Sequence, residues 1–294
     1  MKRLCVLGSL HLDVIVRATQ LPQLDETVNG SGVNYISGGK GGNQALAAES
    51  HGATVYFVGR VGSDTFGQIL TMTLKNRTID ISQLQKDEGA SGMSVAIIDQ
   101  QGDYGAVIVS EANLRIDKSH LNISEDTGIL LLQNEIPDEL NLAASQKASI
   151  VGSQVWLNAA PARKLSQELI KNINLLIINR PEAQFYKDLL NSPECDHIIK
   201  IFTLGENGLD IQCPGQAKKH FTSYDVKALS THGAGDTFIG ALAAHQLRNN
   251  KLLDSLNYAQ AAAAIKVSRD TSDIRVITDN DVSQFLKNLD QSKF

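Results

Sequence analysis

Three small residues precede a carboxylate in the segment STHGAGDTFIGALAAH, residues 230–245. Gly233, Ala234 and Gly235 lead directly into Asp236, and an alanine-rich apolar segment typical of a helix follows. The first N–H groups of a helix have no partner within it, and the helix dipole adds partial positive charge there. The segment therefore predicts an anion hole at the start of a helix, of a kind that suits a phosphoryl group in transfer.

Asp236 defines the chemistry that we expect beside this anion hole. A carboxylate repels a resting phosphate, so it is useful here only if it contacts the attacking nucleophile. As general base, Asp236 would accept the proton of a substrate hydroxyl while the hydroxyl oxygen attacks the γ-phosphate. The alternative is purely structural, with the glycines forming a turn and Asp236 capping the helix.

A second glycine-rich segment, SGGKGGNQALAAE at 37–49, lies far away in the sequence. It lacks the dinucleotide-binding pattern, because Gln44 stands where the last glycine is needed. It also lacks the phosphate-loop pattern, because Gly41 follows Lys40 in place of Ser or Thr. Its glycines would let the backbone approach a polar ligand closely, and Lys40 and Asn43 offer donors. The alternative is a loop that only opens a helix.

The composition excludes several classes of protein. The chain has 294 residues, 42% hydrophobic and 20% charged, which is ordinary for a globular protein with a large core. Its net charge is -5, and its lysines and arginines form no basic run. We therefore expect no binding to nucleic acid or to anionic membranes.

The cysteines and the N-terminus indicate the compartment. Cys5, Cys195 and Cys213 are too few and too dispersed for a disulfide framework or a zinc site, and we expect reduced thiols. The N-terminus is basic and then apolar, as in a signal peptide, but Asp13 interrupts the apolar run. We therefore expect no signal peptide. No apolar run approaches the roughly 20 residues of a membrane span. We expect a cytoplasmic, soluble protein.

Apolar runs rich in β-branched residues alternate with helical patterns along most of the chain. This alternation predicts an α/β fold with a central, mostly parallel sheet flanked by helices. The expected strands are 3–9, 54–62, 128–133, 154–158, 175–179 and 197–205. The expected helices are 41–53, 64–76, 138–149 and one from Pro181, and the last hundred residues are expected to be helical, with helices at 235–249, 252–269 and 279–289.

Two regions depart from this alternation. Residues 11–37 and 91–110 show strand propensity and turn glycines without helices between them. We expect antiparallel strands there that form a small lid over the site, within one domain spanning 1–294. Open sheet edges tend to find partners, so the lid could join two copies of the chain as a homodimer.

Taken together, the motifs resemble the signatures of the ribokinase family of carbohydrate kinases, the phosphofructokinase-B type. The resemblance extends through nearly the whole chain. In chain order, the matching segments are GSLHLD (8–13), GGKGGNQA near residue 40, LLLQNEIP (130–137), LNAAPAR (157–163), NRPE (179–182), TLGENG (203–208) and GAGDTFIGAL near residue 236.

The resemblance implies ATP as phosphoryl donor and a sugar-like acceptor under the lid. It implies that the acceptor site contains His11, Asp13, Gly39, Lys40, Asn43 and Glu135. Carboxylates and amides suit this task because they form paired hydrogen bonds with neighbouring hydroxyls. Structural alternatives stay open for three of these residues, since His11 could be only a strand residue, Asp13 a turn residue and Glu135 a loop residue before a helix.

For the nucleotide, the resemblance implies that Asn179 and Glu182 organise the triphosphate and Mg²⁺, with Glu182 acting through water. Thr203, Gly205 and Gly208 would line the nucleotide site. Alternatively, Asn179 is a polar group at a strand end, and Glu182 is a first-turn acid favoured by the helix dipole.

The chain departs from the family pattern at three places. His11 stands where the family usually carries Asn, which puts ribose itself in doubt as the acceptor. Ser230 replaces an aspartate that helps to bind an activating K⁺, and Thr271 and Ser272 lie in the later segment around that ion, so we expect weak or absent K⁺ activation. The stretch between Glu182 and residue 197 is short, which predicts a trimmed crossover helix.

The sequence thus predicts an ATP-dependent sugar kinase that phosphorylates a primary hydroxyl, that of a pentose such as ribose or a close relative. One alternative is a nucleoside kinase of the same fold, although the lid offers no clear aromatic wall for a base. The other is a sugar- or nucleotide-binding protein that has lost catalysis, against which the intact GAGD segment argues.

Overall fold

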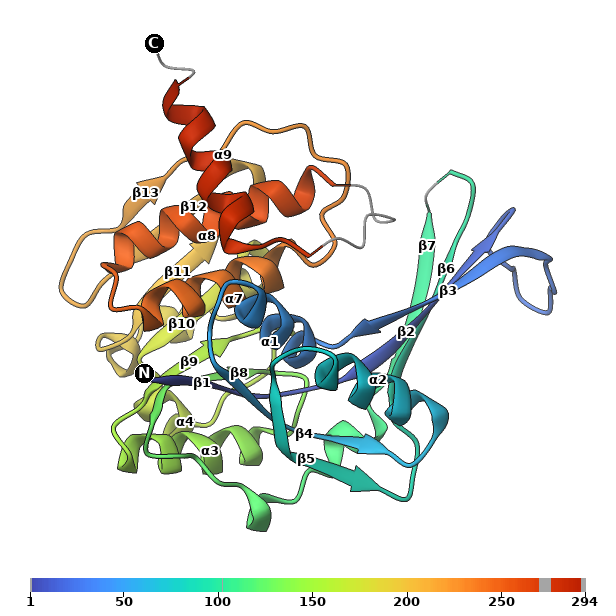
Figure 1. Ribbon diagram of the computed structural model, residues 1–294, viewed down its shortest axis with the longest axis horizontal. Helices are drawn as coiled ribbons and strands as arrows, with labels where there is room; N and C mark the ends of the chain where they lie inside the picture. Colours follow the sequence, from blue (N-terminus) through green and yellow to red (C-terminus); the bar gives the residue numbers. More distant parts are fainter. Residues whose placement is uncertain (1, 102, 270–275, 292–294) are drawn as a thin grey trace.

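The fold is built on one large sheet, the main sheet (Figure 1). The computed structural model describes residues 2–101, 103–269 and 276–291. The main sheet has nine strands in the order β13-β12-β11-β10-β9-β8-β1-β4-β5, and all neighbours are parallel except the β11–β12 and β12–β13 pairs. Its strands are β1 Arg3–Leu7, β4 Val55–Gly62, β5 Asp80–Asp87, β8 Thr127–Gln133, β9 Gln154–Asn158, β10 Leu175–Asn179, β11 Ile199–Thr203, β12 Leu209–Gln212 and β13 Lys219–Phe221.

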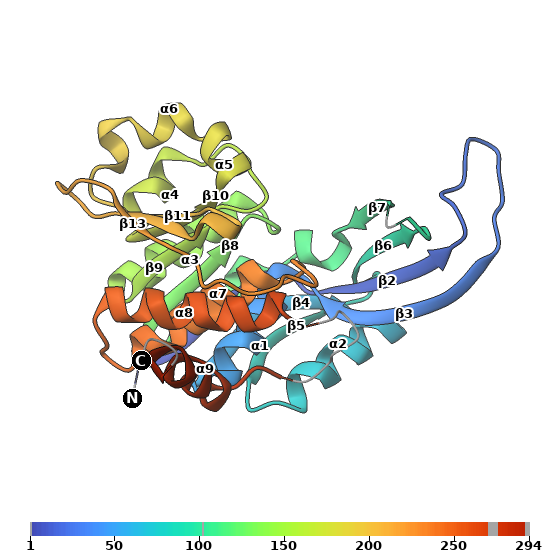
Figure 2. The same ribbon diagram turned by 90° about the horizontal axis from the view of Figure 1, so that it is seen from above.

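Helices cover both faces of the main sheet, as Figure 2 shows from above. One face carries α1 Lys40–Ser50, α2 Thr65–Lys75, α7 Ala234–Leu247, α8 Leu252–Val267 and α9 Asp279–Gln291. The other carries α3 Asp138–Ile150, α4 Gln167–Asn172, α5 Arg180–Phe185 and α6 Lys187–Leu190. Within the described ranges, no helix has both the length and the apolar character that crossing a bilayer requires.

Strand β1 shows why the central strands are apolar along their whole length. Successive side chains of a strand point to opposite faces. Leu4 and Val6 pack into the core under α1 and α7, whereas Cys5 and Leu7 pack into the core under α3. Cys5 is fully buried, which raises the pKa of its thiol to about 12 and keeps it unreactive.

Most predicted elements are confirmed, including the parallel sheet and a helix at Pro181, which the structure divides into the short α5 and α6. The prediction of an all-helical C-terminal third is wrong for β12 and β13, which form a short antiparallel hairpin at the sheet edge. Strand β5 and helix α4 were also not predicted. The sequence of β5, DISQLQKD, is largely polar because β5 is the other edge strand of the main sheet.

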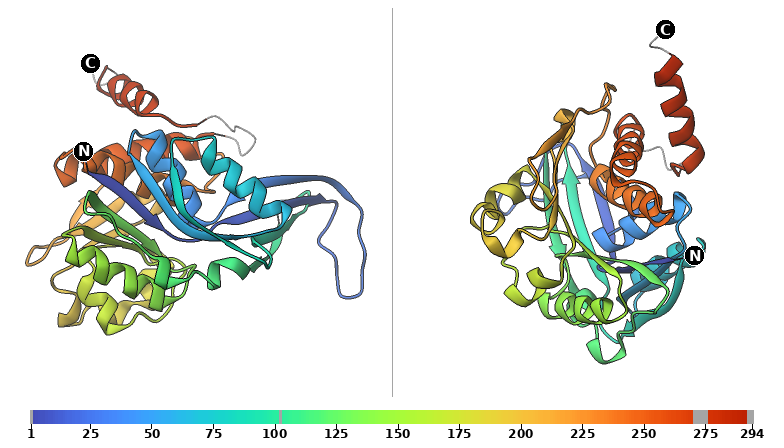
Figure 3. Two further views of the ribbon diagram at one scale, coloured as in Figure 1. Left: turned by 60° about the horizontal axis from the view of Figure 1, so that its bottom comes forward. Right: turned by 90° about the vertical axis from the view of Figure 1, so that its left-hand side faces the viewer.

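A second sheet of four strands, the small sheet, projects from one end of the main sheet (Figure 2 and Figure 3). It consists of β2 His11–Ala18, β3 Gly30–Gly38, β6 Gly92–Ile98 and β7 Tyr104–Val109. The pairs β2–β3 and β6–β7 are antiparallel, as predicted, but β2 and β6 pair in parallel. The reason is that β2 follows β1 and β6 follows β5, so both strands leave the main sheet in the same direction.

The two faces of the small sheet differ in chemistry. Residues paired across strands share a face. One face, the inner face, carries Asp13, paired with Ile36 and Ser94. The opposite face, the outer face, carries an apolar row that runs through Tyr35, Val14, Val95 and Val107.

Candidate active site

The carboxyl ends of the central parallel strands bring polar residues to one edge of the main sheet. Ser9 follows β1 closely, Glu135 follows β8, and Asn158, Asn179 and Thr203 are the last residues of β9, β10 and β11. Because parallel strands end at the same edge, these residues lie together although they are far apart in sequence. This is the edge where open α/β sheets bind their ligands.

Glycines allow the start of α1 to approach this edge closely. Gly39 precedes the helix with a φ of 87°, and a Cβ there would come within 2.8 Å of the Ser9 carbonyl oxygen. A Cβ on Gly41 would meet the backbone of residue 8 at 2.7 Å. The approach places the Lys40 N–H 2.8 Å from Glu135 Oε2, and the Ser9 hydroxyl donates to the same oxygen.

The start of α7 presents Asp236 to the same region. Gly233 is the N-cap, in the left-handed conformation with a φ of 71°, and Asp236 lies in the first turn. Its side chain accepts hydrogen bonds from Gln44 Nε2 at 2.9 Å and from Asn43 Nδ2 at 3.2 Å. Asp236 therefore does not cap α7, and the structural alternative for this residue is wrong.

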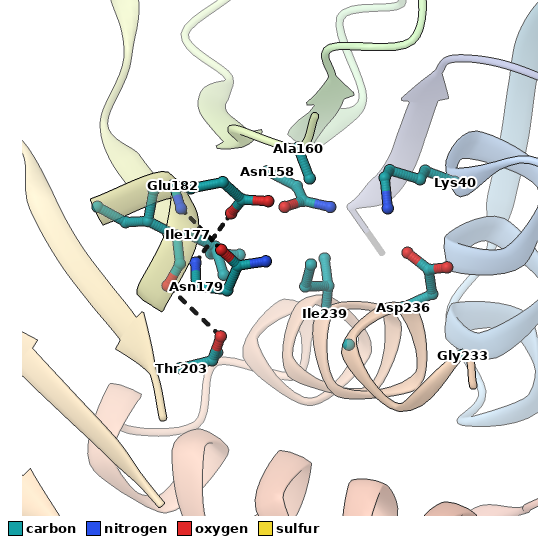
Figure 4. Close-up of a pocket in the computed structure, with 12 residues that line it drawn as sticks. Lys40, Asn158, Ala160, Ile177, Asn179, Glu182, Thr203, Gly233, Asp236 and Ile239 are labelled. Atoms are coloured by element: carbon teal, nitrogen blue, oxygen red, sulfur yellow. Dashed lines mark hydrogen bonds between the residues drawn. The ribbon is translucent and has the colours of Figure 1, made fainter. Parts of the chain in front are cut away.

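A pocket of about 170 Å³ connects α7 to the strand ends (Figure 4). Figure 4 shows Lys40 and Asp236 at one end and Asn179, Glu182 and Thr203 at the other. Its lining combines polar residues with small and apolar ones: Lys40, Asn158, Ala160, Ile177, Ile178, Asn179, Glu182, Thr203, Gly233, Gly235, Asp236 and Ile239.

Burial controls the charge of both pocket carboxylates. It raises the pKa of Asp236 against the opposing effects of the Lys40 charge and of the hydrogen bonds from Gln44 and Asn43. Burial likewise raises the pKa of Glu182, again opposed by Lys40. Both carboxylates are therefore costly to ionise, and the positive charge of Lys40 favours the ionised form of each. Further positive charge in this site would be favourable for the same reason.

Asn179 and Glu182 hold each other in a capping box at the start of α5. The Glu182 N–H donates to Asn179 Oδ1 at 2.9 Å, and the Asn179 N–H donates to Glu182 Oε2 at 2.8 Å. As the structural alternatives predicted, Asn179 stands at the end of a strand and Glu182 in the first turn of a helix. Both side chains also line the pocket, so the structural role does not exclude the predicted one.

His11 and Asp13 lie on the inner face of the small sheet, beside the pocket but outside its lining. Asp13 accepts a hydrogen bond from the Ser94 hydroxyl, and burial raises its pKa. His11 is only 3% exposed, and burial lowers its pKa. Its Nε2 has no hydrogen-bond partner within the described part of the chain, although Glu135, Asp13 and Lys40 all act on its charge.

Some predicted residues lie outside the pocket. Gly205 and Gly208 have positive φ angles of 63° and 83° and shape the turn between β11 and β12, without contributing to the lining. Ala234 begins α7 but does not line the pocket either. The Ser230 N–H donates to the Val267 carbonyl oxygen at 3.1 Å. Thr271 and Ser272 lie outside the described residues.

The sequence reasoning did not identify several residues of the site, among them Asn158, Ile239 and Gln44. Asn158 ends a predicted strand, as Asn179 does, so the same position rule could have identified it. Ile239 lies one turn after Asp236 on α7, and helical spacing could have found it. The contact between Gln44 and Asp236 had no sequence signal, because it depends on the packing of α7 against α1.

Comparison with known proteins agrees with this arrangement. Residues 1–277 match the family described as pfkB family carbohydrate kinase. A curated relative, the ribokinase of Bacillus subtilis, is 31% identical over 293 residues, covering 97% of this chain and 100% of the relative.

Solved structures show the same fold. The ribokinase of Thermotoga maritima has a TM-score of 0.88 and 26% identity, covering 98% of this chain and 100% of that one. The ribokinase of Arabidopsis thaliana complexed with ribose and ATP has a TM-score of 0.88 and 25% identity, covering 97% and 99%.

The fold and the site therefore define a phosphotransferase that acts on an alcohol group. The chain belongs to the pfkB family of carbohydrate kinases. The predicted family and the ribokinase-like fold are confirmed.

Proposed function

We propose that the protein transfers the γ-phosphoryl group of ATP to the primary hydroxyl of a pentose, ribose or a close relative. The observation that carries this proposal is Asp236, a half-buried carboxylate that faces a pocket at the N-terminus of α7 beside Lys40. The full-length similarity to ribokinases, one of them solved with ribose and ATP, supports the choice of donor and acceptor.

The residues of the chain divide the work of the transfer. The acceptor is held by His11 and Asp13 from the inner face of the small sheet, by Glu135 after β8 and by Asn43 on α1. Asp236 takes the proton of the primary hydroxyl as its oxygen bonds to the γ-phosphorus. The bond from phosphorus to the bridging oxygen breaks, and ADP leaves with that electron pair.

Positive groups at the pocket stabilise the charge of the transferring phosphoryl group. The Ala234 N–H already donates to the Thr231 carbonyl oxygen at 3.3 Å, so we propose that the N–H groups of Gly233 and Gly235, which line the pocket, receive the anion. Lys40 supplies a full positive charge near Asp236. We further propose that Asn179 and Thr203 hold the triphosphate, with Gly205 and Gly208 shaping the loop beside the nucleotide.

The residues present fit Mg²⁺ that arrives with the nucleotide. Within the described residues, no group of three or more His, Cys, Asp or Glu side chains could hold a metal ion. Mg²⁺ needs no such set, because it commonly binds one or two carboxylates, phosphates and water. Glu182, buried at the phosphate end of the pocket with a raised pKa, would hold it directly or through water. When bound, Mg²⁺ neutralises charge on the phosphates.

ADP release with Mg-ATP, measured across pentoses, deoxypentoses, ketohexoses and nucleosides, tests the proposal. Turnover highest on a pentose is expected. Turnover highest on nucleosides would make the protein a nucleoside kinase. Ligand-induced thermal stabilisation without ADP release would make it a binding protein.

Monovalent cations should have little effect on this enzyme. Ser230 offers a neutral hydroxyl where the family carries an aspartate, and a neutral oxygen binds K⁺ less strongly than a carboxylate. We expect turnover to change by less than about twofold when K⁺ replaces Na⁺ at constant ionic strength, and Ser230→Asp to increase the response to K⁺. A large rise in wild-type turnover with K⁺ would contradict this.

We also propose that the small sheet acts as a lid on a single domain, residues 1–294, and pairs with that of a second copy. Its outer face leaves Tyr35 59% and Val107 65% exposed, which is unusual for side chains in an apolar row. Val107→Glu is expected to convert a dimer to a monomer in sedimentation experiments. Ile150→Glu, at a still more exposed apolar residue on α3, is the control that leaves the dimer intact. A wild-type monomer would refute the pairing.

The use of ATP, together with three free cysteines, further supports a cytoplasmic location as part of this proposal. Secretion of the tagged full-length protein would contradict it.

A further inference from the structure

Two buried glutamines form a hydrogen-bonded relay that ends on Asp236. Gln133, the last residue of β8, donates from Nε2 to Gln44 Oε1 over 2.8 Å. Gln44, on α1, donates from Nε2 to Asp236 Oδ1 over 2.9 Å. Both glutamines are 0% exposed. The relay thus connects the main sheet, α1 and α7 through side chains that water does not reach.

The chemistry of the groups fixes the direction of the relay. An ionised carboxylate only accepts hydrogen bonds, so Gln44 must turn its NH₂ group toward Asp236. Its carbonyl oxygen then faces Gln133, which must offer its own NH₂ group. Rotating either amide by half a turn would bring two acceptors or two donors together in a buried place, which is costly.

Two glycines allow the elements that carry the relay to pack closely. A Cβ on Gly240 of α7 would lie 2.7 Å from the backbone carbonyl oxygen of Gln44, so α7 can approach α1 closely only without a side chain there. A Cβ on Gly8 would lie 1.9 Å from Gln133 Oε1, so the Gln133 amide fits only beside a glycine.

The two oxygens of Asp236 therefore have different surroundings. Oδ1 accepts the shorter hydrogen bond, from a donor that is fully buried and held from behind by Gln133. Among the residues that the structure describes, Oδ2 has only the longer contact of 3.2 Å with Asn43 Nδ2. The acceptor hydroxyl can replace or share that longer contact at much lower cost.

We propose that Gln44 is a positioning residue for phosphoryl transfer: it holds Asp236 Oδ1 and so reserves Oδ2 for the proton of the acceptor hydroxyl. This inference rests on the proposed function. Gln133 acts through Gln44 by fixing the orientation of its amide. The other charged groups that act on Asp236 are Lys40 on α1 and Glu135 after β8, and the test substitutions change neither.

The main variant is Gln44→Met, which keeps the length of the side chain and removes the hydrogen bonds. We expect kcat to fall by about 100-fold, as for a catalytic group that loses its position, with KM for sugar and Mg-ATP within about threefold. The acidic limb of the kcat–pH profile should move to higher pH, because the hydrogen bond that favours the charged form of Asp236 is lost. Gln133→Met should cause a smaller change in the same direction.

A matched control separates positioning from simple core packing. Gln85 on β5 exchanges two side-chain hydrogen bonds with the Asp117 backbone, at 2.8 and 2.9 Å, far from the pocket. Gln85→Met should lower stability without moving the pH profile. In an Asp236→Asn background, Gln44→Met should cause little further loss of kcat, because no base remains to be positioned.

Three results would overturn the relay: an unchanged kcat in Gln44→Met, an unchanged pH profile, or an equal loss of kcat with and without Asp236. If the wild-type protein shows no turnover on any acceptor, the proposed function fails, and the relay is then tested by the pKa of Asp236 instead of by kcat. Carboxyl ¹³C NMR, with the Asp236 signal assigned from Asp236→Asn, should then show a higher pKa in Gln44→Met than in the wild type. An equal pKa would overturn the relay without any assay of activity.

Discussion

Asp236→Asn should lower kcat by about 10³–10⁴-fold while the protein folds normally. The amide keeps the shape of the carboxylate but cannot accept the proton of the acceptor hydroxyl. Binding of Mg-ATP should change little, because the N–H groups at Gly233–Gly235 and the Lys40 charge stay in place. Steady-state kinetics with the preferred sugar, together with nucleotide binding by calorimetry, measure the two effects separately.

The same variant should not be less stable than the wild type. Burial raises the pKa of Asp236 in the folded protein above its unfolded value. The folded state therefore binds the proton more tightly, and stability from this group is lost as pH rises through the unfolded pKa toward the folded one. Above this pH range the wild type carries the full cost of the charge, which the neutral amide of the variant avoids. We expect a melting temperature for Asp236→Asn equal to or above that of the wild type.

A matched control is Asp80→Asn, which removes a carboxylate that pairs with Arg3 and lies on β5, the edge strand at the opposite side of the main sheet from β11 and β12. Its kcat should stay within about twofold of wild type. Near-normal turnover of Asp236→Asn, or an equal loss in both variants, would contradict the role of Asp236 as base.

Gly240→Ala should have the second largest effect, on both stability and turnover. The new Cβ would meet Ala47 Cβ at 2.6 Å and the Ala48 nitrogen at 2.7 Å, and the nitrogen belongs to a helix that cannot easily move. Ala normally favours a helix over Gly by about 1 kcal/mol, but overpacking of this kind costs about 1–3 kcal/mol. We expect a net loss of stability in urea unfolding, and a fall in kcat of about 10-fold or more as Asp236 moves away from Gln44.

Gly235→Ala is the control for stability, since it lies on the same helix and its Cβ would meet nothing within 4 Å. It should unfold at the same or a higher urea concentration than the wild type. Equal stability of Gly240→Ala and Gly235→Ala would show that α7 and α1 are not held as closely as the structure indicates.

The local sequence pattern was sufficient to predict single strands and the starts of helices. The apolar run of β1 and the small residues before Asp236 specify a buried strand and the start of a helix by themselves. The parallel order of the main sheet brings Asn179 and Thr203 to the same edge. Only the family resemblance implied roles for these residues and for the acceptor residues, and those roles remain proposals.

Contacts between distant elements could not be predicted in this way. Strand β5 is polar because it is an edge strand, and its sequence shows no buried alternation. The parallel pairing of β2 with β6 follows from where each strand leaves the main sheet, which no local signal contains. The relay through Gln44 requires the α7 backbone to lie against α1 at Gly240, and a glycine in a helix has no specific partner in the sequence.

The most direct test of the central claim is ³¹P NMR of the product formed from Mg-ATP and ribose, with 5-deoxyribose as the matched acceptor that lacks the primary hydroxyl. The proposal predicts one sugar phosphate signal split by two CH₂ protons with ribose, and no sugar phosphate with 5-deoxyribose. A phosphate on the anomeric or a secondary hydroxyl, or phosphorylation of 5-deoxyribose, would contradict transfer to the primary hydroxyl.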